Sequence, residues 1–301
     1  MPTKYELQAA RRLAIRQARY ETAIQGVLRE ALRKIEADLK VIYNKYAVDG
    51  VLTKAQMTQY NRLATLERQL IADLNPALRA NVVTLTRLRP EQYQAAFFNY
   101  AWTIDQQAGI ALSWGTVNKR AITETLGNRF FSKAVRDYGP NARRWVREAV
   151  NDGLIRGKSY QRMARDLKGA INSTYNQALT IVRTEGGYAQ SAGQSDAYVA
   201  AQEQGVQGVR RWIATLDNVT RGDHAAMDAA PQQEDGLYHL PGGETARYPR
   251  DMSLSAGNRI NCRCDETFEI DGYAPELRRT REDGIVPNQT YAEWVMDRRT
   301  F

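Results

Sequence analysis

The sequence predicts an α+β fold, with a mainly helical N-terminal body and a small antiparallel β-containing module near the C-terminus. Apolar residues recur every three or four positions as far as Gln204, which is typical of amphipathic helices. Beyond Gly205 they alternate with polar residues over short runs bounded by glycine or proline, which is typical of strands. With 301 residues, 43% hydrophobic and 25% charged, the chain is long enough for one large or two ordinary domains.

The N-terminal body is predicted to begin with a long helix over residues 5–46, because this segment has no proline and its apolar residues keep helical spacing. The run Val48-Asp49-Gly50 interrupts that pattern. Thr53 and Gln56 then have the spacing of a capping box, which predicts a second helix to about Leu74. We therefore expect two long antiparallel helices within a helical N-terminal region at residues 1–130.

Two proline sites are predicted to interrupt the helices that follow. Asn75-Pro76 and Arg89-Pro90 should end helical segments, because the residue before a proline avoids helical geometry. A second domain, of helices followed by a small sheet, is predicted over residues 131–272, and a C-terminal tail over 273–301. Its helices are expected at 140–151, 159–170 and 173–204, its strands at 209–216 and 263–270, and a short hairpin at 236–243, with a further short helix at 291–296 in the tail.

The net charge of +8 is unevenly distributed. Residues 1–200 carry 30 Lys and Arg against 17 Asp and Glu, whereas residues 201–301 carry 12 against 17. Residues 111–170 alone hold thirteen basic and five acidic side chains, an excess that predicts a polyanionic partner. All apolar runs are shorter than a membrane span, and the start of the chain lacks the apolar core of a signal peptide. We expect a protein made and assembled in the cytoplasm, with no membrane partner.

Basic residues near the predicted helices at 140–170 are candidates for contact with double-stranded DNA. Lys and Arg side chains neutralise phosphates, so such binding would be independent of base sequence and steeply salt-dependent. A solvated helical face explains the same charges equally well. The candidates are Lys133, Arg136, Arg143, Arg144, Arg147, Lys158, Arg162, Arg165 and Lys168.

The C-terminal half carries an ordered set of polar residues and thiols. An Arg-Thr-Glu triplet falls on a predicted helix, an Asp, an Arg and a His follow a Trp-bearing strand, and an Asn-Cys-Arg-Cys run closes the set. This pattern resembles the phage Mu F-like head-morphogenesis domain over roughly residues 140–272. Ala229 departs from the family pattern, in which many members have a glycine after the aspartate. The residues that carry the resemblance are Arg183, Glu185, Asp217, Arg221, His224, Asn261, Cys262, Arg263 and Cys264.

The resemblance implies a minor head protein of a tailed bacteriophage, which is a structural component of the virion and not an enzyme. It implies a position inside the capsid near the portal vertex, with the portal protein and packaged double-stranded DNA as partners. It also implies a role in head assembly and in genome packaging or ejection. The scaffold or major capsid protein is a further partner that it suggests, and assembly would take place in the host cytoplasm.

The cysteines raise the question of a metal site. Cys262 and Cys264, with His224 and His239, supply the ligand types that tetrahedral zinc prefers. Zinc sites usually leave two to four residues between paired cysteines, whereas a single residue separates these two. We therefore favour buried thiols that pack without a metal, and no cofactor, over a zinc site. The alternative function is a metal-dependent nuclease or other hydrolase centred on His224, Cys262 and Cys264.

Spacings of four and three residues place Asp217, Arg221 and His224 on one face of a helix predicted to begin at Asp217 or the next residue, with the aspartate as N-cap and as partner of the arginine. This structural role is favoured over catalysis with His224 as base, because the sequence has none of the common hydrolase motifs.

Arg183 and Glu185 lie on different sides of their helix. We expect one of them to dock the C-terminal module, through Asp217 or Arg221 respectively.

Overall fold

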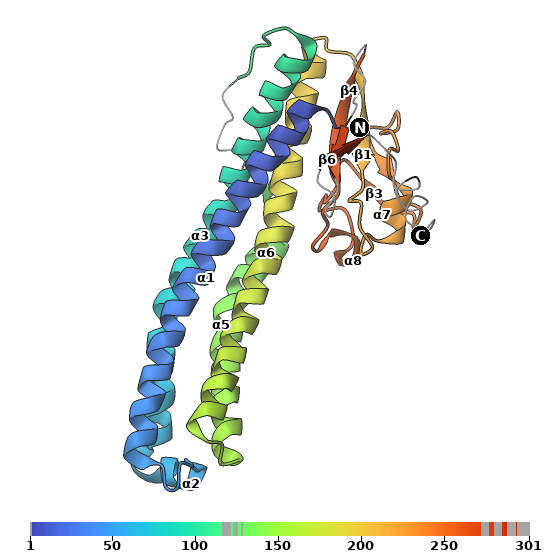
Figure 1. Ribbon diagram of the computed structural model, residues 1–301. Coiled ribbons are helices and arrows are strands. Elements are labelled where there is room, and N and C mark those ends of the chain that lie inside the picture. Colours follow the sequence, from blue (N-terminus) through green and yellow to red (C-terminus); the bar gives the residue numbers. More distant parts are fainter. Residues whose placement is uncertain are drawn as a thin grey trace. The chain divides into compact units, whose positions relative to one another are not determined.

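The computed structural model describes residues 2–115, 122, 126–127, 129–271, 277–279, 285–287 and 293 (Figure 1). None of the described helices is long and apolar enough to cross a membrane. The elements in these residues are α1 (Lys4–Tyr46), α2 (Lys54–Thr58), η1 (Gln59–Asn61), α3 (Arg62–Ala108), α5 (Arg129–Ile155), α6 (Tyr160–Glu203), β1 (Gly208–Ile213), α7 (Gly222–Ala226), β2 (Tyr238–His239), β3 (Thr245–Ala246), α8 (Ala256–Arg259), β4 (Asp265–Ile270), β5 (Leu277–Arg279) and β6 (Ile285–Pro287).

The predicted fold class is confirmed: long helices come first, and short antiparallel strands follow near the C-terminus. Strand β1 pairs with β4, β2 with β3, and β5 with β6, each pair antiparallel. The predicted strands at 209–216 and 263–270 correspond to β1 and β4, and the hairpin near 236–243 corresponds to β2 and β3. The helix expected over residues 291–296 lies outside the described residues, apart from Glu293.

The capping box at Thr53 is present, but the helix that it opens is short. The Thr53 side chain accepts a hydrogen bond from the backbone of Gln56, and the Gln56 side chain accepts one from the backbone of Thr53. The helix α2 ends at Thr58, because Tyr60 and Asn61 adopt left-handed φ values of 54° and 56° and turn the chain. The single helix expected as far as Leu74 is therefore wrong, and a new helix, α3, begins at Arg62.

The helix breaks expected at prolines are also wrong. Pro76 and Pro90 both lie inside α3, and Pro140 lies inside α5. An internal proline costs about 3 kcal/mol, because it removes one backbone hydrogen bond and crowds the preceding turn. Burial of apolar residues on both sides outweighs that cost, as at Leu74 and Leu78 around the first proline. The segments expected at 159–170 and 173–204 likewise form one helix, α6.

The chain divides into two compact units, each assembled from separated segments. The first unit combines residues 1–18, 88–128 and 182–301, and the second combines residues 19–87 and 129–181. The helices α1, α3 and α6 contribute residues to both units. The domain limits expected from the sequence, near residues 130 and 272, stay a prediction.

The second unit is helical, and its apolar faces pack against one another. Polar contacts join its segments: the Tyr43 hydroxyl donates to the carbonyl of Lys158 at 2.7 Å, and Asn81 donates to the Tyr138 hydroxyl at 2.9 Å. The regular four- and seven-residue spacing of the buried residues confirms the periodicity read from the sequence. On α1 these residues are Ile24, Leu28, Ile35 and Leu39, and on α3 they are Leu66, Leu70, Leu74, Leu78 and Leu85.

In the first unit, α3 and α6 approach each other closely at Gly193. A Cβ atom at Gly193 would overlap the carbonyl oxygen of Tyr93 and would lie 3.2 Å from the backbone nitrogen of Phe97. Only glycine allows the two backbones to come so near. Next to this crossing, Tyr198 lies edge-on to Tyr100 and tilted against Phe268, with ring centroids 5.7 Å and 5.3 Å apart. Phe268 belongs to β4, so this aromatic cluster holds the strand pair against the helices.

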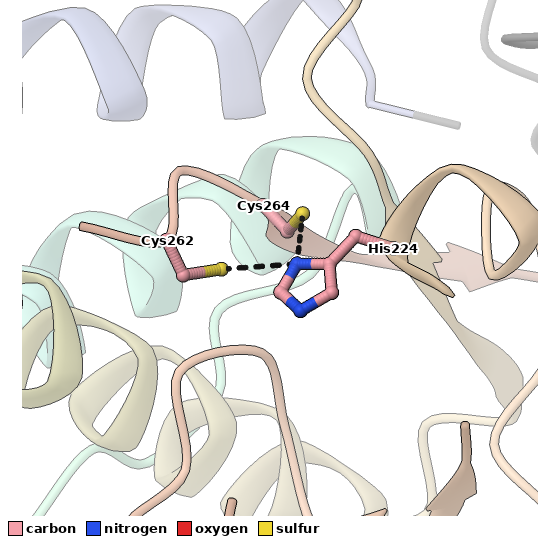
Figure 2. Close-up of side chains that lie close together, drawn as sticks. All are labelled: His224, Cys262 and Cys264. Carbon is pink, nitrogen blue, oxygen red and sulfur yellow. Dashed lines mark hydrogen bonds between the residues drawn. The ribbon is translucent and has the colours of Figure 1, made fainter. Parts of the chain in front are cut away.

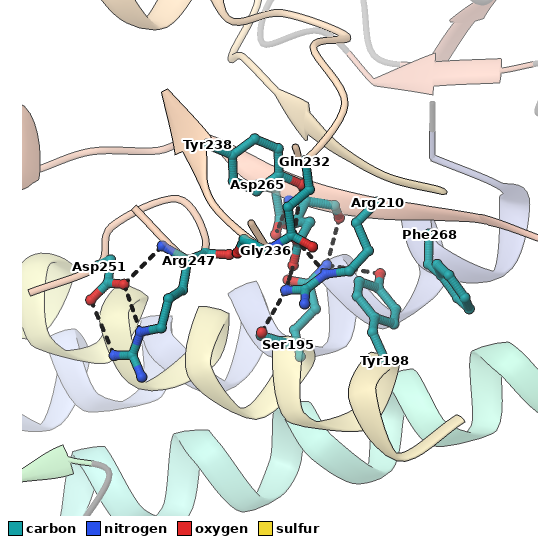
Figure 3. A network of polar contacts seen from close by, with 12 residues as sticks. Ser195, Tyr198, Arg210, Gln232, Gly236, Tyr238, Arg247, Asp251, Asp265 and Phe268 are labelled. Carbon is teal, nitrogen blue, oxygen red and sulfur yellow. Dashed lines mark hydrogen bonds and ion pairs between the residues drawn. The ribbon is translucent and has the colours of Figure 1, made fainter. Parts of the chain in front are cut away.

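A buried ion pair lies beneath the strand pair. Arg210 of β1 donates to both carboxylate oxygens of Glu266 on β4, at 2.9 Å and 3.0 Å, and also to the Ser195 hydroxyl on α6 (Figure 3). The Tyr238 hydroxyl donates to the same carboxylate at 2.8 Å. Side-chain exposure is 7% for Arg210 and 1% for Glu266, so the hydrogen bonds compensate for the loss of solvation of both charges.

The first turn of α1 is tied to β4 by a second buried carboxylate. Glu6 accepts hydrogen bonds from the Thr267 hydroxyl at 2.7 Å and from the backbone nitrogen of Phe268 at 3.1 Å. The Tyr198 hydroxyl donates to Glu6 at 2.9 Å, and Thr3 donates from its backbone nitrogen at 2.7 Å. The Glu6 side chain thus connects the first turn of α1 to β4.

Candidate functional site

The motif residues of the C-terminal half converge in space, and an ion pair joins their two sequence segments. Asp217 follows β1, and Arg263 immediately precedes the last cysteine. Arg263 donates to both oxygens of Asp217, with a distance of 3.0 Å from Nη2 to Oδ1. Asp217 also accepts from the Thr220 hydroxyl at 3.0 Å and from the backbone nitrogen of Val219 at 3.1 Å. Burial raises the pKa of Asp217, but the hydrogen bonds from Arg263 and Thr220 outweigh it and lower the pKa to about 2.

The helix expected to begin at Asp217 starts later. α7 begins at Gly222, with Arg221 as its N-cap residue, so the Asp217–Arg221 pair predicted along a first turn is wrong. The reason is local: the Asp217 carboxylate accepts from the backbone nitrogen of Val219, which closes a turn in place of a helix. Arg221 instead donates to the carbonyl oxygen of Ile260 at 2.6 Å, which adds a second tie between the two segments.

Ala229 adopts the backbone conformation that its place in the family pattern suggests. Its φ is +64°, in the left-handed region that favours glycine. The turn is held on both sides: the backbone nitrogen of Ala229 donates to the carbonyl of Trp212 at 2.9 Å, and Asp228 accepts from the backbone nitrogen of Ala214 at 2.8 Å. Asp228 and the turn after it therefore fix the end of β1.

His224, Cys262 and Cys264 lie together in the interior. The Nδ1 atom of His224 is 3.2 Å from the Sγ atom of Cys264 and 3.5 Å from that of Cys262 (Figure 2). The three ligand atoms all lie within 4.8 Å of one another, and the residues are 1%, 5% and 3% exposed in sequence order. The ring of Trp212 stands edge-on to the imidazole, with centroids 5.5 Å apart.

The thiols of Cys262 and Cys264 share a hydrogen bond. A hydrogen bond from the Cys264 thiol, with help from His224 and Arg250, lowers the pKa of Cys262 well below its usual value. The same contact with Cys262, together with burial, raises the pKa of Cys264. Arg250 donates to the carbonyl of Arg263 at 3.3 Å and to that of Gly187 on α6 at 3.1 Å, so its charge is held beside the thiols.

His239 does not join this cluster. Its side chain is 54% exposed, and its Nε2 atom lies 2.7 Å from the Asp235 carboxylate. The four-residue set considered from the sequence is thus reduced to three residues by the fold, with His239 on the surface.

The remaining motif residues connect the cluster to α6. Glu185 is buried and forms an ion pair with Arg89 of α3 at 3.4 Å, whereas Arg183, two residues earlier, has an exposed side chain. Thr184 between them accepts from the backbone nitrogen of Asn261 at 3.1 Å. Asn261 has a φ of +56°, which turns the chain immediately before the first cysteine. Thr184 of the triplet therefore contacts the C-terminal module, and the docking role expected of Arg183 or Glu185 stays a prediction.

The nine basic candidates lie on α5, on α6 and in the connection between them, all within the second unit. Several are engaged with acids: Lys133 and Arg136 with Asp137, Arg144 with Glu148, and Lys158 with Asp152 and Asp166. Arg143 is half-buried and donates to Asn75 at 3.4 Å. The side chains of Arg147, Arg162, Arg165 and Lys168 are exposed.

Sequence reasoning missed the buried charged residues that hold the elements of the site together. Arg210 and Glu266 lie within the strands predicted at 209–216 and 263–270, but neither was named as a candidate site residue. Their opposite charges on two strands predicted for one sheet were the available signal. Arg250 gave no such signal, because its burial depends on α6 passing beside it.

Comparison with known families matches residues 144–267 to the family described as phage Mu protein F like protein, and this range includes every motif residue from Arg183 to Cys264. The chain is also 25% identical over 288 residues to the minor head protein GP7 of Bacillus phage SPP1, an alignment that covers 93% of this chain and 92% of GP7. Residues 144–267 are therefore similar to the Mu F-like family of phage head proteins.

Two further relatives match this chain only in part. It is 28% identical over 293 residues to the NAD(+)–arginine ADP-ribosyltransferase EFV of Enterococcus faecalis, covering 95% of this chain but 59% of the transferase. It is 28% identical over 155 residues to the uncharacterized protein YqbB of Bacillus subtilis, covering 49% of this chain and 50% of YqbB. No solved structure matches it.

Proposed function

We propose that this protein is a minor head protein that lies inside the capsid beside the portal, contacts packaged double-stranded DNA, and acts in head assembly and in genome packaging or ejection. The similarity to GP7 carries this proposal, because that alignment covers 92% of a protein named as a minor head protein. During assembly the protein would reside in the host cytoplasm, with the portal protein and the scaffold or major capsid protein as partners.

A structural role is favoured over an enzymatic one. The alignment with the ADP-ribosyltransferase leaves about two fifths of that protein unmatched, whereas GP7 is matched almost throughout. The nuclease alternative requires His224 to reach a phosphodiester. The imidazole is 1% exposed and its Nδ1 atom faces two buried thiols, so a polymer backbone has no access to it in this arrangement. We infer that the chain has no hydrolase site at this cluster.

The face proposed to contact DNA is on the first turns of α6. Arg162, Arg165 and Lys168 are exposed and recur every three residues, which places them along one side of the helix. The neighbouring candidates that are engaged with acids offer less charge to a phosphate, because a bound carboxylate must first be displaced. Contacts of this kind fix a protein on DNA through phosphates without reading base sequence.

DNA binding can be tested by fluorescence anisotropy with a duplex of arbitrary sequence over a range of salt concentrations. Replacing Arg162, Arg165 and Lys168 with Gln should lower the slope of log affinity against log salt by roughly two to three, since each phosphate contact contributes about 0.9. The matched control replaces Arg19, Arg29 and Lys40, which are exposed on α1 in the same unit. Equal losses in the two triple variants would refute a localised DNA-binding face.

Portal association is tested by coexpression with the portal protein of the same phage. The two proteins should copurify, and cryo-electron microscopy of full heads should place the minor protein inside the capsid at the portal vertex. Density for it on the outer capsid surface, or its absence from purified heads, would overturn the proposed location.

A further inference from the structure

We propose that His224, Cys262 and Cys264 form a structural zinc site, with Nδ1 of the imidazole and the two Sγ atoms as ligands. The site would join α7 to the segment that leads into β4. This inference does not depend on the proposed contacts with portal or DNA, because it concerns only the interior of the C-terminal module.

The ligand spacing supports a metal ion in place of simple packing. Zinc bonds of about 2.0 to 2.3 Å in tetrahedral geometry hold ligand atoms roughly 3.5 to 4 Å apart. Here the nitrogen lies 3.2 Å and 3.5 Å from the two sulfurs, and all three atoms lie within 4.8 Å of one another. Figure 2 shows both sulfurs directed at the same ring nitrogen. Small movements of these side chains would place a zinc ion at the centre of the three atoms.

The short cysteine spacing, which argued against zinc in the sequence, is explained by the local backbone. Side chains alternate in an extended segment, so Cys262 and Cys264 face one way and Arg263 between them faces the other. Arg263 is held there by Asp217, and Arg221 binds the carbonyl of Ile260. Both cysteines therefore face His224 as a pair, in an arrangement fixed by contacts outside the trio.

The donor set and its surroundings favour zinc among the common ions. Two thiolates and one imidazole suit zinc, whereas magnesium and calcium prefer oxygen ligands. Two thiolates balance the charge of Zn²⁺, which allows all three groups to be buried without excess charge. The fourth position would be taken by a water molecule or a group outside this trio. Deep burial of the three ligands fits a site that stabilises the fold.

The first test measures metal directly in the full-length protein, purified without a histidine tag. Inductively coupled plasma mass spectrometry should find one zinc ion per chain, and Co²⁺ in its place should give the visible bands of tetrahedral coordination with a thiolate-to-cobalt charge-transfer band. If the folded protein takes up neither ion at equimolar metal, the proposal is refuted.

Variants then locate the ion. Cys264→Ser changes one ligand atom with little change in volume, and it should weaken zinc binding by at least tenfold and abolish much of the charge-transfer band. His224→Gln should change the cobalt spectrum while keeping the charge-transfer band. His239→Ala is the matched control, because His239 is exposed and outside the cluster, and it should retain full metal content. Metal bound equally by wild type and Cys264→Ser would overturn the assignment.

Circular dichroism accompanies each measurement, so that loss of metal is separated from loss of folding. Chelation of wild-type protein gives an independent readout. Removal of zinc should lower the melting temperature of the wild type and leave that of Cys264→Ser unchanged, whereas a chelator without effect on the wild type would contradict a structural site.

Discussion

Arg263 and Asp217, 46 positions apart in the sequence, form a two-pronged hydrogen-bonded ion pair that ties the residue between the two cysteines to the turn after β1. The Asp217 side chain is 2% exposed, whereas that of Arg263 is 40% exposed. The carboxylate therefore loses more solvation than the guanidinium. Breaking the pair would leave the carboxylate as an unpaired charge in the interior, which is destabilising.

Protonation of Asp217 should destabilise the protein in acid. Because its folded pKa is about 2, below the roughly 4 of an unfolded aspartate, the stabilisation is complete above pH 4 and is lost as the pH falls towards 2. Asp217→Asn should cost roughly 2 kcal/mol at neutral pH and should lose less stability than wild type between pH 5 and 2. Urea unfolding at several pH values measures both. Parallel pH profiles for the two proteins would show that the pair contributes no pH dependence.

Ala229→Gly should stabilise the protein, because it relieves the left-handed conformation with φ of +64°. An alanine in this region costs about 1 kcal/mol, so a gain of roughly 0.5 to 1 kcal/mol in the free energy of unfolding is expected. Ala225→Gly, inside α7, is the control and should destabilise by a similar amount. Urea denaturation would count against this account of the turn if both substitutions shifted the midpoint in the same direction.

Gly193→Ala should destabilise the first unit strongly, by more than about 2 kcal/mol, because the new methyl group would overlap the backbone of Tyr93 on α3. Gly169, in the same helix, has open space around its Cα, so Gly169→Ala should stabilise by about 0.5 to 1 kcal/mol through helix propensity. Thermal unfolding should show a lower melting temperature for Gly193→Ala and a higher one for Gly169→Ala. A neutral Gly193→Ala would mean that the helices can separate at no cost.

The parts of the fold that follow from local pattern could be predicted from the sequence. The periodicity of α1, the capping box at Thr53 and the alternation of β1 and β4 each depend on residues close in the chain. The continuation of α3 through Pro76 and Pro90 could not be predicted, because it depends on the burial of its neighbours by other helices. Local propensity is a weak guide where tertiary packing opposes it.

Several motif residues lie close together in the structure, but the pairing expected for Asp217 was wrong. Spacing along a helix suggested a partner for Asp217 four residues away, whereas its partner Arg263 comes from a distant segment. The candidate metal ligands show the same limit of sequence-based prediction. Residue type made His224 and His239 equally good candidates, and only the fold shows that His224 is buried and His239 exposed. A single sequence contains no direct record of such long-range proximity.

The hydrogen bond between Glu6 and Phe268 spans 262 positions, and this has a consequence for synthesis on the ribosome. Nearly the entire chain must be translated before the start of α1 can meet β4. The segments of the second unit, residues 19–87 and 129–181, are all available much earlier. Cotranslational folding should therefore begin with the helical second unit. The first turn of α1 would stay exposed, with the Glu6 carboxylate in solvent, until β4 has been made. Chains that end before β4 would therefore lack the contacts that complete the first unit.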